Sequence, residues 1–157
     1  MSVQHVYGDA GFLYIPNLSF SVPLYEPKKG VKSQDIVDRD NSAVIKRRFN
    51  GGHCDYIADH AKQGFDVIKR CHIGMEAVIQ TPELAHTYKC VAIMPGTNTG
   101  YNLITCTGQK LTAVKWADLC LYTCNDSTGK SITMVFFKKA ETVNKPIYGG
   151  GEPIIWR

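Results

Sequence analysis

The sequence predicts a mainly β domain that contains about eight short strands and one or two short helices. Short runs of strand-forming residues recur along the chain, and turn residues rich in Gly, Pro, Asn and Asp separate them. One segment, 61–71, has the periodicity of a helix. Many short strands with regular turn signals form a closed or nearly closed barrel, or a sandwich.

The first half of the chain holds the earlier expected strands. Segments that contain Pro are expected to end the first two strands, because Pro belongs at strand ends and edges. The second strand is expected to end at the segment 23–27. An Asn-Gly-Gly turn signal ends the third, and the polar stretch 28–42 is expected to be a loop. The strands are expected at 12–16, 18–22, 43–49 and 54–60.

A short amphipathic helix is expected over 61–71. Phe65, Ile68 and Cys71 recur there at intervals of three residues, which places them on one face. Gly74 then ends the segment, as Gly does at many helix C-termini.

Further strands are expected in the second half of the chain, with turns at Pro82 and over 95–100. The tail after 144 is rich in Gly and Pro, and is either a flexible end or a final strand at 154–156. The strands are expected at 76–81, 87–94, 101–106, 111–114, 119–124 and 131–138, with 101–106 and 111–114 forming a hairpin.

The composition is that of an ordinary globular domain, with 44% hydrophobic and 20% charged residues. A single domain over 1–157 is expected, with a core of about 12–140 and flanking segments 1–11 and 141–157. The net charge of +4 is mild. The basic clusters at 46–48 and 69–70 are expected to lie on faces of the protein exposed to solvent. They therefore do not indicate a nucleic-acid partner.

The N-terminal residues lack the basic region and apolar run of a signal peptide, and no stretch approaches the length of a membrane span. The location therefore stays open between the cytoplasm and a surface reached through an anchor outside this sequence. Six Cys residues without a Cys-x-x-Cys spacing do not resemble a disulfide framework. Free thiols favour a reducing compartment. Cys90, Cys106 and Cys120 alternate with apolar neighbours and are expected in the core.

Cys124 is the candidate nucleophile. It ends the apolar run 119–124, and the polar turn residues 125–129 follow at once. A rigid strand that delivers a thiol to a loop-lined rim is a common way to hold a nucleophile. Four residues separate Cys124 from Cys120, so on a strand both side chains share one face. The alternative is that Cys124 is a small buried apolar residue without a chemical role.

A thiol attacks well only as the thiolate, so Cys124 needs a base or a cation nearby. His60 is the best placed of the five His residues, because it ends an expected strand and precedes the expected helix. An alternative use of His60 is a zinc site with the His-Cys-Asp run 53–55. No second pair of ligands has a matching spacing, so neither a metal nor another cofactor is expected.

Four separated segments, spread over about 12–140, together resemble the sortase family of cysteine transpeptidases. The segment ending in Ile-Ala-Asp-His60, with the helix and Gly74 after it, is similar to the family's His segment. Leu-Tyr-Thr-Cys124 resembles the Leu-x-Thr-Cys that ends its nucleophile strand. The two other segments, 14–25 and 132–140, are similar to the family's opening strands and to the strand after the Cys.

This resemblance implies a closed eight-stranded barrel and a peptide or protein substrate with a sorting-type motif. Cys124 would attack a peptide carbonyl and form a thioester. His60 would protonate the leaving amine and then deprotonate the incoming amine acceptor. Water in place of that amine would make the protein a hydrolase, a thiol protease. The family also implies a place at the bacterial cell surface, on the cell wall.

The chain departs from the family pattern in two places. Asp59 stands where the family usually has Gly before its His. The strand after the Cys should carry an Arg that faces the thiol, but Thr133 falls near that place, with Ser131 on the same face and Lys130 as the nearest cation. Thr133 is therefore the candidate oxyanion or substrate position. A hydroxyl brings no charge, and losing a charged donor costs on the order of a few kcal/mol.

A second near-copy of the signature, Leu-Ile-Thr-Cys106, is the weaker candidate, because it comes too early in the strand order after His60. Two function classes remain. The first is a sortase-like cysteine transpeptidase or peptidase. The second is a catalytically weak or inactive sortase-fold binding or structural protein, to which the missing Arg points.

Overall fold

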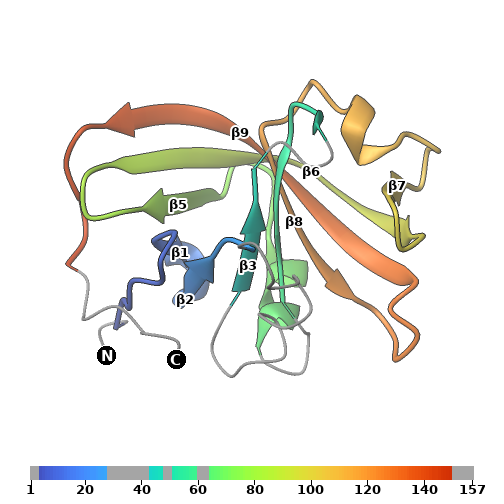
Figure 1. Cartoon of the computed structure of the whole chain (residues 1–157), viewed down its shortest axis with the longest axis horizontal. Helices are drawn as coiled ribbons and strands as arrows, with labels where there is room; N and C mark the ends of the chain where they lie inside the picture. Colours follow the sequence, from blue (N-terminus) through green and yellow to red (C-terminus); the bar gives the residue numbers. More distant parts are fainter. Residues whose placement is uncertain (1–3, 28–42, 48–50, 60–63, 150–157) are drawn as a thin grey trace.

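The computed structural model describes residues 4–27, 43–47, 51–59 and 64–149. Within these ranges the chain forms one sheet in the order β5-β1-β2-β3-β4-β8-β9-β6-β7, and β5 also pairs with β6. The pairing of β5 with β6 closes eight strands into a barrel and leaves β7 outside it, which confirms the expected closed eight-stranded barrel (Figure 1). The strands are β1 (Phe12–Ile15), β2 (Phe20–Tyr25), β3 (Ala43–Lys46), β4 (Asp55–Ala58), β5 (Glu76–Gln80), β6 (Ala85–Asn98), β7 (Leu103–Thr105), β8 (Leu119–Cys124) and β9 (Ser131–Val143).

The described helices are short 3₁₀ turns: η1 (Pro16–Leu18), η4 (Phe65–Arg70) and η5 (Leu111–Ala113). The amphipathic helix expected over 61–71 is in fact η4, and 61–63 lie outside the described residues. Phe65 and Ile68 are both fully buried. Side chains three residues apart eclipse in a 3₁₀ helix, which explains why the three-residue interval was the visible signal. No helix in the described ranges is long and apolar enough to cross a membrane.

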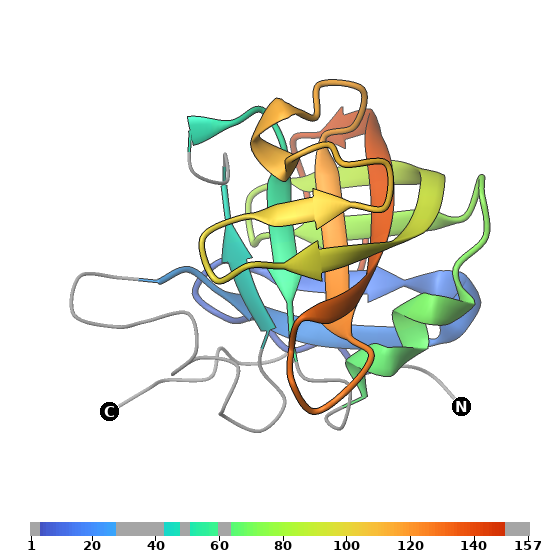
Figure 2. The ribbon, with the colours of Figure 1, turned by 90° about the vertical axis from the view of Figure 1, so that its right-hand side faces the viewer.

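Two layers of buried side chains lie on the two faces of the sheet. One cluster fills the barrel and draws on every barrel strand, including Leu119 and Leu121 of β8. The other cluster lies against the outer face of β4, β8 and β9, and includes Cys120 of β8. The segment between the start of β7 and the start of β8 covers this outer cluster with Leu103, Leu111, Val114 and Ala117 (Figure 2). Since β8 is covered on both faces, its sequence is a continuous apolar run rather than an alternating one.

β6 is longer than the strand expected at 87–94, and it continues through the Pro-Gly pair that predicted a turn. The carbonyl of Pro95 accepts a hydrogen bond from the N–H of Cys106, so the backbone of Pro95 faces away from β9. The missing N–H of Pro95 is therefore not needed in the β9 ladder. Gly96 fits between strands, because an added Cβ would lie 2.4 Å from Met134 Sδ and 2.7 Å from the carbonyl oxygen of Ile104.

The hairpin expected between 101–106 and 111–114 is present only as an isolated antiparallel bridge between Ile104 and Lys110, and the strand expected at 111–114 is wrong. β7 pairs along its length with the end of β6, from Gly96 to Asn98, and Leu111–Ala113 forms η5. Leu111 is fully buried in the outer cluster, so its apolar character reflects packing rather than strand pairing.

The expected end of the second strand at Pro23 is also wrong, because β2 continues to Tyr25. In β2, only Leu24 and Tyr25 pair with β3, so β3 requires no N–H from Pro23. The loop expected over 28–42 and the strand expected over 154–156 lie outside the described residues.

The side chain of Gln80, at the end of β5, joins both flanking segments to the barrel through hydrogen bonds. Its side chain is fully buried. The Nε2 group donates to the hydroxyl of Tyr7 at 2.9 Å and to the carbonyl of Tyr148, and Oε1 accepts the N–H groups of Ile147 and Tyr148, each at 2.9 Å. Every donor and acceptor direction of the carboxamide is therefore used.

We expect Gln80→Met to lower the free energy of unfolding by about 2–4 kcal/mol, because it removes four hydrogen bonds from a buried group while keeping its length. Urea denaturation followed by circular dichroism measures this change. Gln4→Met, at an exposed position, is the control and should shift the midpoint little. Equal midpoints for both variants would show that the carboxamide does not stabilise the fold.

Candidate functional site

Cys124 lies at the C-terminal end of β8, half-buried and next to a turn. β8 is a central strand of the sheet, antiparallel to β9 and parallel to β4, and Cys124 is opposite Ile132 of β9. Its side chain packs against the outer cluster with Tyr122, on the same face as Cys120. The shared face of Cys120 and Cys124 agrees with their spacing of four residues. The thiol is thus held by a rigid strand and remains partly open to solvent.

The turn after β8 folds back toward the sulfur. The N–H of Asn125 donates to the carbonyl of Ser131 at 2.8 Å, which continues the ladder by one residue. Asp126 accepts hydrogen bonds from both the N–H and the hydroxyl of Thr128. An added Cβ on Gly129 would lie 3.9 Å from Cys124 Sγ, so the absence of a side chain there leaves room beside the thiol.

The surroundings of Cys124 raise the pKa of its thiol above the ordinary value. Burial is the largest cause, and the negative charge of Asp126 acts in the same direction. The ammonium group of Lys69, on η4, partly opposes both effects and lowers the pKa. Because only the thiolate is nucleophilic, these groups alone leave Cys124 mainly protonated at neutral pH.

β4 ends beside β8. The two strands are parallel, with Ala58 opposite Tyr122, and the hydroxyl of buried Thr123 donates to the carbonyl of Asp59 at 3.3 Å. The next residue in the sequence is His60, the predicted base, which lies outside the described residues. The described part of the chain therefore reaches the site up to Asp59, and the pairing of Cys124 with His60 stays a prediction.

Thr133, the predicted oxyanion position, lies opposite Thr123 in the β8–β9 ladder. Its hydroxyl donates to Oδ1 of Asn125 at 2.7 Å, and Nδ2 of Asn125 donates to Oγ of Ser131 at 3.1 Å. Neighbouring residues of a strand point to opposite faces, so Thr133 and the residue opposite Cys124 do not share a face. A role for Thr133 at an oxyanion stays a prediction, and it requires the hydroxyl to leave Asn125.

The other thiols differ clearly from Cys124. Four are buried, and burial raises the pKa of Cys54 and of Cys71 to about 12. Cys106 is exposed in the turn after β7, so its expected place in the core is wrong. The core positions expected for Cys90 and Cys120 are confirmed. Of the six thiols, Cys124 alone combines partial exposure with a place at the end of a central strand.

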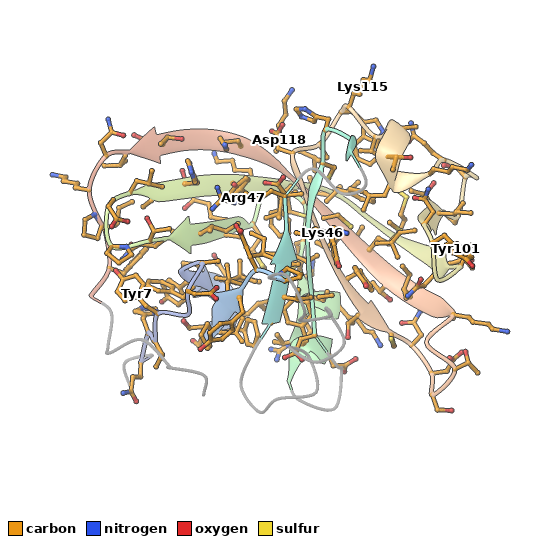
Figure 3. The ribbon with its side chains drawn as sticks, viewed as in Figure 1. Tyr7, Lys46, Arg47, Tyr101, Lys115 and Asp118 are labelled. Carbon is orange, nitrogen blue, oxygen red and sulfur yellow. The ribbon has the colours of Figure 1, made fainter. Side chains whose placement is uncertain are left out.

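His53 and Asp118 form a polar pair at the end of β8 opposite to Cys124. Nε2 of His53 lies 2.6 Å from Oδ1 of Asp118, and the N–H of Lys139 donates to Oδ2. Figure 3 shows Asp118 at the end of the sheet away from η4. His53 is thus held by a hydrogen bond to Asp118. Within the described ranges, no three His, Cys, Asp or Glu side chains are grouped so that they could hold a metal ion.

Lys69 and Asp126 were not singled out from the sequence as neighbours of the thiol. Lys69 belongs to a pair of basic residues expected on a face exposed to solvent, and Asp126 belongs to a turn. Neither has a local signal, because the distance from Lys69 to the thiol depends on how η4 packs against β8.

Comparisons with known proteins give structural relatives only. No family model matches the chain, and no curated protein sequence matches it. Sortase E1 from Streptomyces coelicolor, solved with a tripeptide in its active site, has a TM-score of 0.64 and 22% identity, over 91% of this chain and 93% of that one. The SrtA sortase from Actinomyces oris has a TM-score of 0.63 and 17% identity, over 90% and 85% of the two chains.

Sortase C-3 from Streptococcus pneumoniae has a TM-score of 0.63 and 16% identity, over 87% of this chain and 64% of that longer one. The match thus extends to sortases of different lengths. This chain therefore has the sortase fold.

Proposed function

We propose that this chain is a sortase-like cysteine transpeptidase or peptidase, with Cys124 as the nucleophile and His60 as the acid and base. The fold supports the reaction class. The half-buried thiol at the end of β8 supports the choice of nucleophile, since rigid strand ends commonly hold such groups.

The observation that carries the proposal is the parallel pairing of β4 with β8. Ala58 is opposite Tyr122, and the hydroxyl of Thr123 reaches the carbonyl of Asp59. Two strands that run side by side in the same direction support a contact between the residues further along each of them. Two residues beyond the Ala58–Tyr122 pair, the sequence has His60 after β4 and Cys124 at the end of β8.

In the proposed reaction, the thiolate of Cys124 attacks the carbonyl carbon of a peptide bond. A carbon–sulfur bond forms, the carbon–nitrogen bond breaks, and the leaving amine takes a proton from His60. The incoming amine then gives a proton to His60 and attacks the thioester. The new amide forms, the carbon–sulfur bond breaks, and the thiolate is released. Water in place of the amine gives hydrolysis.

The proposed substrate is a peptide or protein with a sorting-type motif, joined to an amine acceptor at a bacterial cell wall. The tripeptide in the active site of Streptomyces coelicolor sortase E1 supports a peptide ligand. On the face that bears Cys124, the rings of Tyr56 and Tyr122 stack with centroids 5.6 Å apart, and Tyr122 is partly exposed. Because Tyr56 is buried, only Tyr122 can meet a ligand on this face, and its aromatic ring suits an apolar peptide segment.

The second candidate is a sortase-fold binding or structural protein with weak or no activity. The raised pKa of Cys124 favours it, because burial and Asp126 both oppose thiolate formation. β9 also has no Arg or Lys between Ser131 and Phe137 that could offset these effects.

We expect Cys124→Ala to abolish cleavage of sorting-type peptides and to leave the fold intact. Cleavage is measured as release of a fluorophore from quenched peptides, and the fold by circular dichroism. Cys106→Ala is the matched control, because this exposed thiol follows the same Leu-Ile-Thr type of run. Peptide cleavage that survives in Cys124→Ala, or is lost in Cys106→Ala, would rule out Cys124 as the nucleophile.

We expect His60→Ala to slow alkylation of Cys124 by iodoacetamide at neutral pH about tenfold or more, since an imidazole partner increases the thiolate fraction. Mass spectrometry of the Cys124 peptide gives the rate. His53→Ala removes a histidine at the far end of β8 and should change nothing. A wild-type rate no faster than that of a free thiol, with no effect of His60→Ala, would support the inactive candidate.

A further inference from the structure

Side chains from both flanking segments cover the outer face of β1. Phe12 and Tyr14 alternate with residues that face into the barrel, so their own rings point outward. Phe12 is nevertheless fully buried, because the rings of His5 and Tyr7 pack against it with centroids 4.7 and 5.1 Å away. Tyr148, which follows β9, makes a T-shaped contact with Tyr14 at 4.9 Å. We call this group of rings the aromatic clasp, and Figure 3 shows Tyr7 at its place beside β1.

His5 is at the centre of the aromatic clasp. Its imidazole ring stacks on Phe12, makes a T-shaped contact with Tyr14 at 4.3 Å, and has its centroid 5.7 Å from that of Tyr148. Nδ1 of His5 lies 2.9 Å from Oγ of Ser21 on β2. This single side chain therefore joins β1, β2 and the segment after β9.

The aromatic clasp also completes the hydrogen bonds of Gln80. Nε2 donates to the hydroxyl of Tyr7, and Oε1 accepts the N–H groups of Ile147 and Tyr148, each at 2.9 Å. Because Gln80 is fully buried, release of either flanking segment leaves part of its carboxamide unpaired. The two segments are thus coupled, since loss of one weakens the hold on the other.

The groups that face His5 from other elements carry no charge. Tyr14 of β1 and Tyr148 present phenol rings, which do not ionise at acid or neutral pH, and Ser21 of β2 presents a hydroxyl. Among the described residues, no carboxylate forms a hydrogen bond or an ion pair with His5. Glu76 of β5 acts instead on Tyr148, where it follows burial and Tyr14 among the causes that raise the pKa of the hydroxyl.

The segment that carries His5 adds no countercharge either. Tyr7 is another phenol, and Asp9 is directed to the end of β2, where its Oδ1 accepts the N–H of Glu26 at 3.1 Å. An imidazolium in the aromatic clasp would therefore be surrounded by rings and a hydroxyl, without a carboxylate partner in the described part of the chain.

Protonation of His5 works against the closed clasp. Burial lowers the pKa of His5, so the packed imidazole binds a proton less readily than a released, solvated one does. The contribution of His5 to the closed state is therefore fully present above the ordinary pKa of about 6.5. It is lost progressively as the pH falls through the lowered value.

We propose that the aromatic clasp is a pH-sensitive fastening of both flanking segments, closed while His5 is neutral and opened when His5 binds a proton. Opening frees residues 4–7 and 147–149 and exposes the outer face of β1, while the barrel stays folded. The backbone hydrogen bonds of Ala10 and Gly11 with Leu24 keep the next part of the N-terminal flank in place. The proposal does not depend on the proposed function, because the clasp shares no residue with the site around Cys124.

The test follows hydrogen exchange of the Ile147 and Tyr148 amides by nuclear magnetic resonance at about pH 7.5 and about pH 5, on either side of the ordinary histidine pKa. Rates are corrected for the intrinsic pH dependence of exchange. We expect the corrected exchange in the wild type to be about threefold faster or more at the lower pH, with the amides of β8 unchanged. His5→Phe keeps a ring but cannot bind a proton, so its exchange should not depend on pH.

Two matched controls should keep the pH dependence of the wild type. His72→Gln removes an exposed histidine in the turn before β5, and Glu76→Gln removes the carboxylate that acts on Tyr148. Corrected exchange that is equal at both pH values in the wild type, or slower at the lower one, would overturn the inference. So would the same pH dependence in His5→Phe, its loss in Glu76→Gln, or parallel opening of β8, which would indicate unfolding of the whole barrel.

Discussion

The parallel pairing of β4 with β8 is the constraint on which the rest of the structure depends. These strands are separated by η4, β5, β6, β7 and η5 in the chain, yet they lie side by side in the sheet. Their pairing joins the half of the barrel that begins with β1 to the half that contains β8, β9 and β6. It also brings the carbonyl of Asp59 to the hydroxyl of Thr123, immediately before Cys124. The pairing that joins the two halves of the barrel is thus the same one that brings together the two segments of the candidate site.

The site combines two opposing requirements. A thiol at the end of a packed strand is well positioned, but the packing that positions it also removes water and favours the neutral form. Charged groups must then offset burial. In this chain the offsetting charge is that of Lys69 on a short helix, whereas Asp126 in the turn acts in the same direction as burial. The acidity of Cys124 therefore depends on tertiary packing.

The sequence was informative wherever a local pattern reflected a local cause. The runs at β1, β8 and β9, and the thiol at the end of β8, were predicted because short apolar runs bounded by turn residues form strands. It was misleading at Pro95 and Leu111, where a neighbouring strand or the outer cluster determines the conformation. Lys69 could not be assigned at all, since its place depends on contacts between segments distant in the chain.

The double coverage of β8 has a consequence for motion. A strand with partners on both edges and packed side chains on both faces belongs to the part of a protein that opens last, so its amide protons should exchange with solvent near the rate of global unfolding. The turn at 125–130, by contrast, is mostly exposed, so its amide protons should exchange faster than those of β8. The sulfur of Cys124 therefore stands at the boundary between slowly and rapidly exchanging backbone.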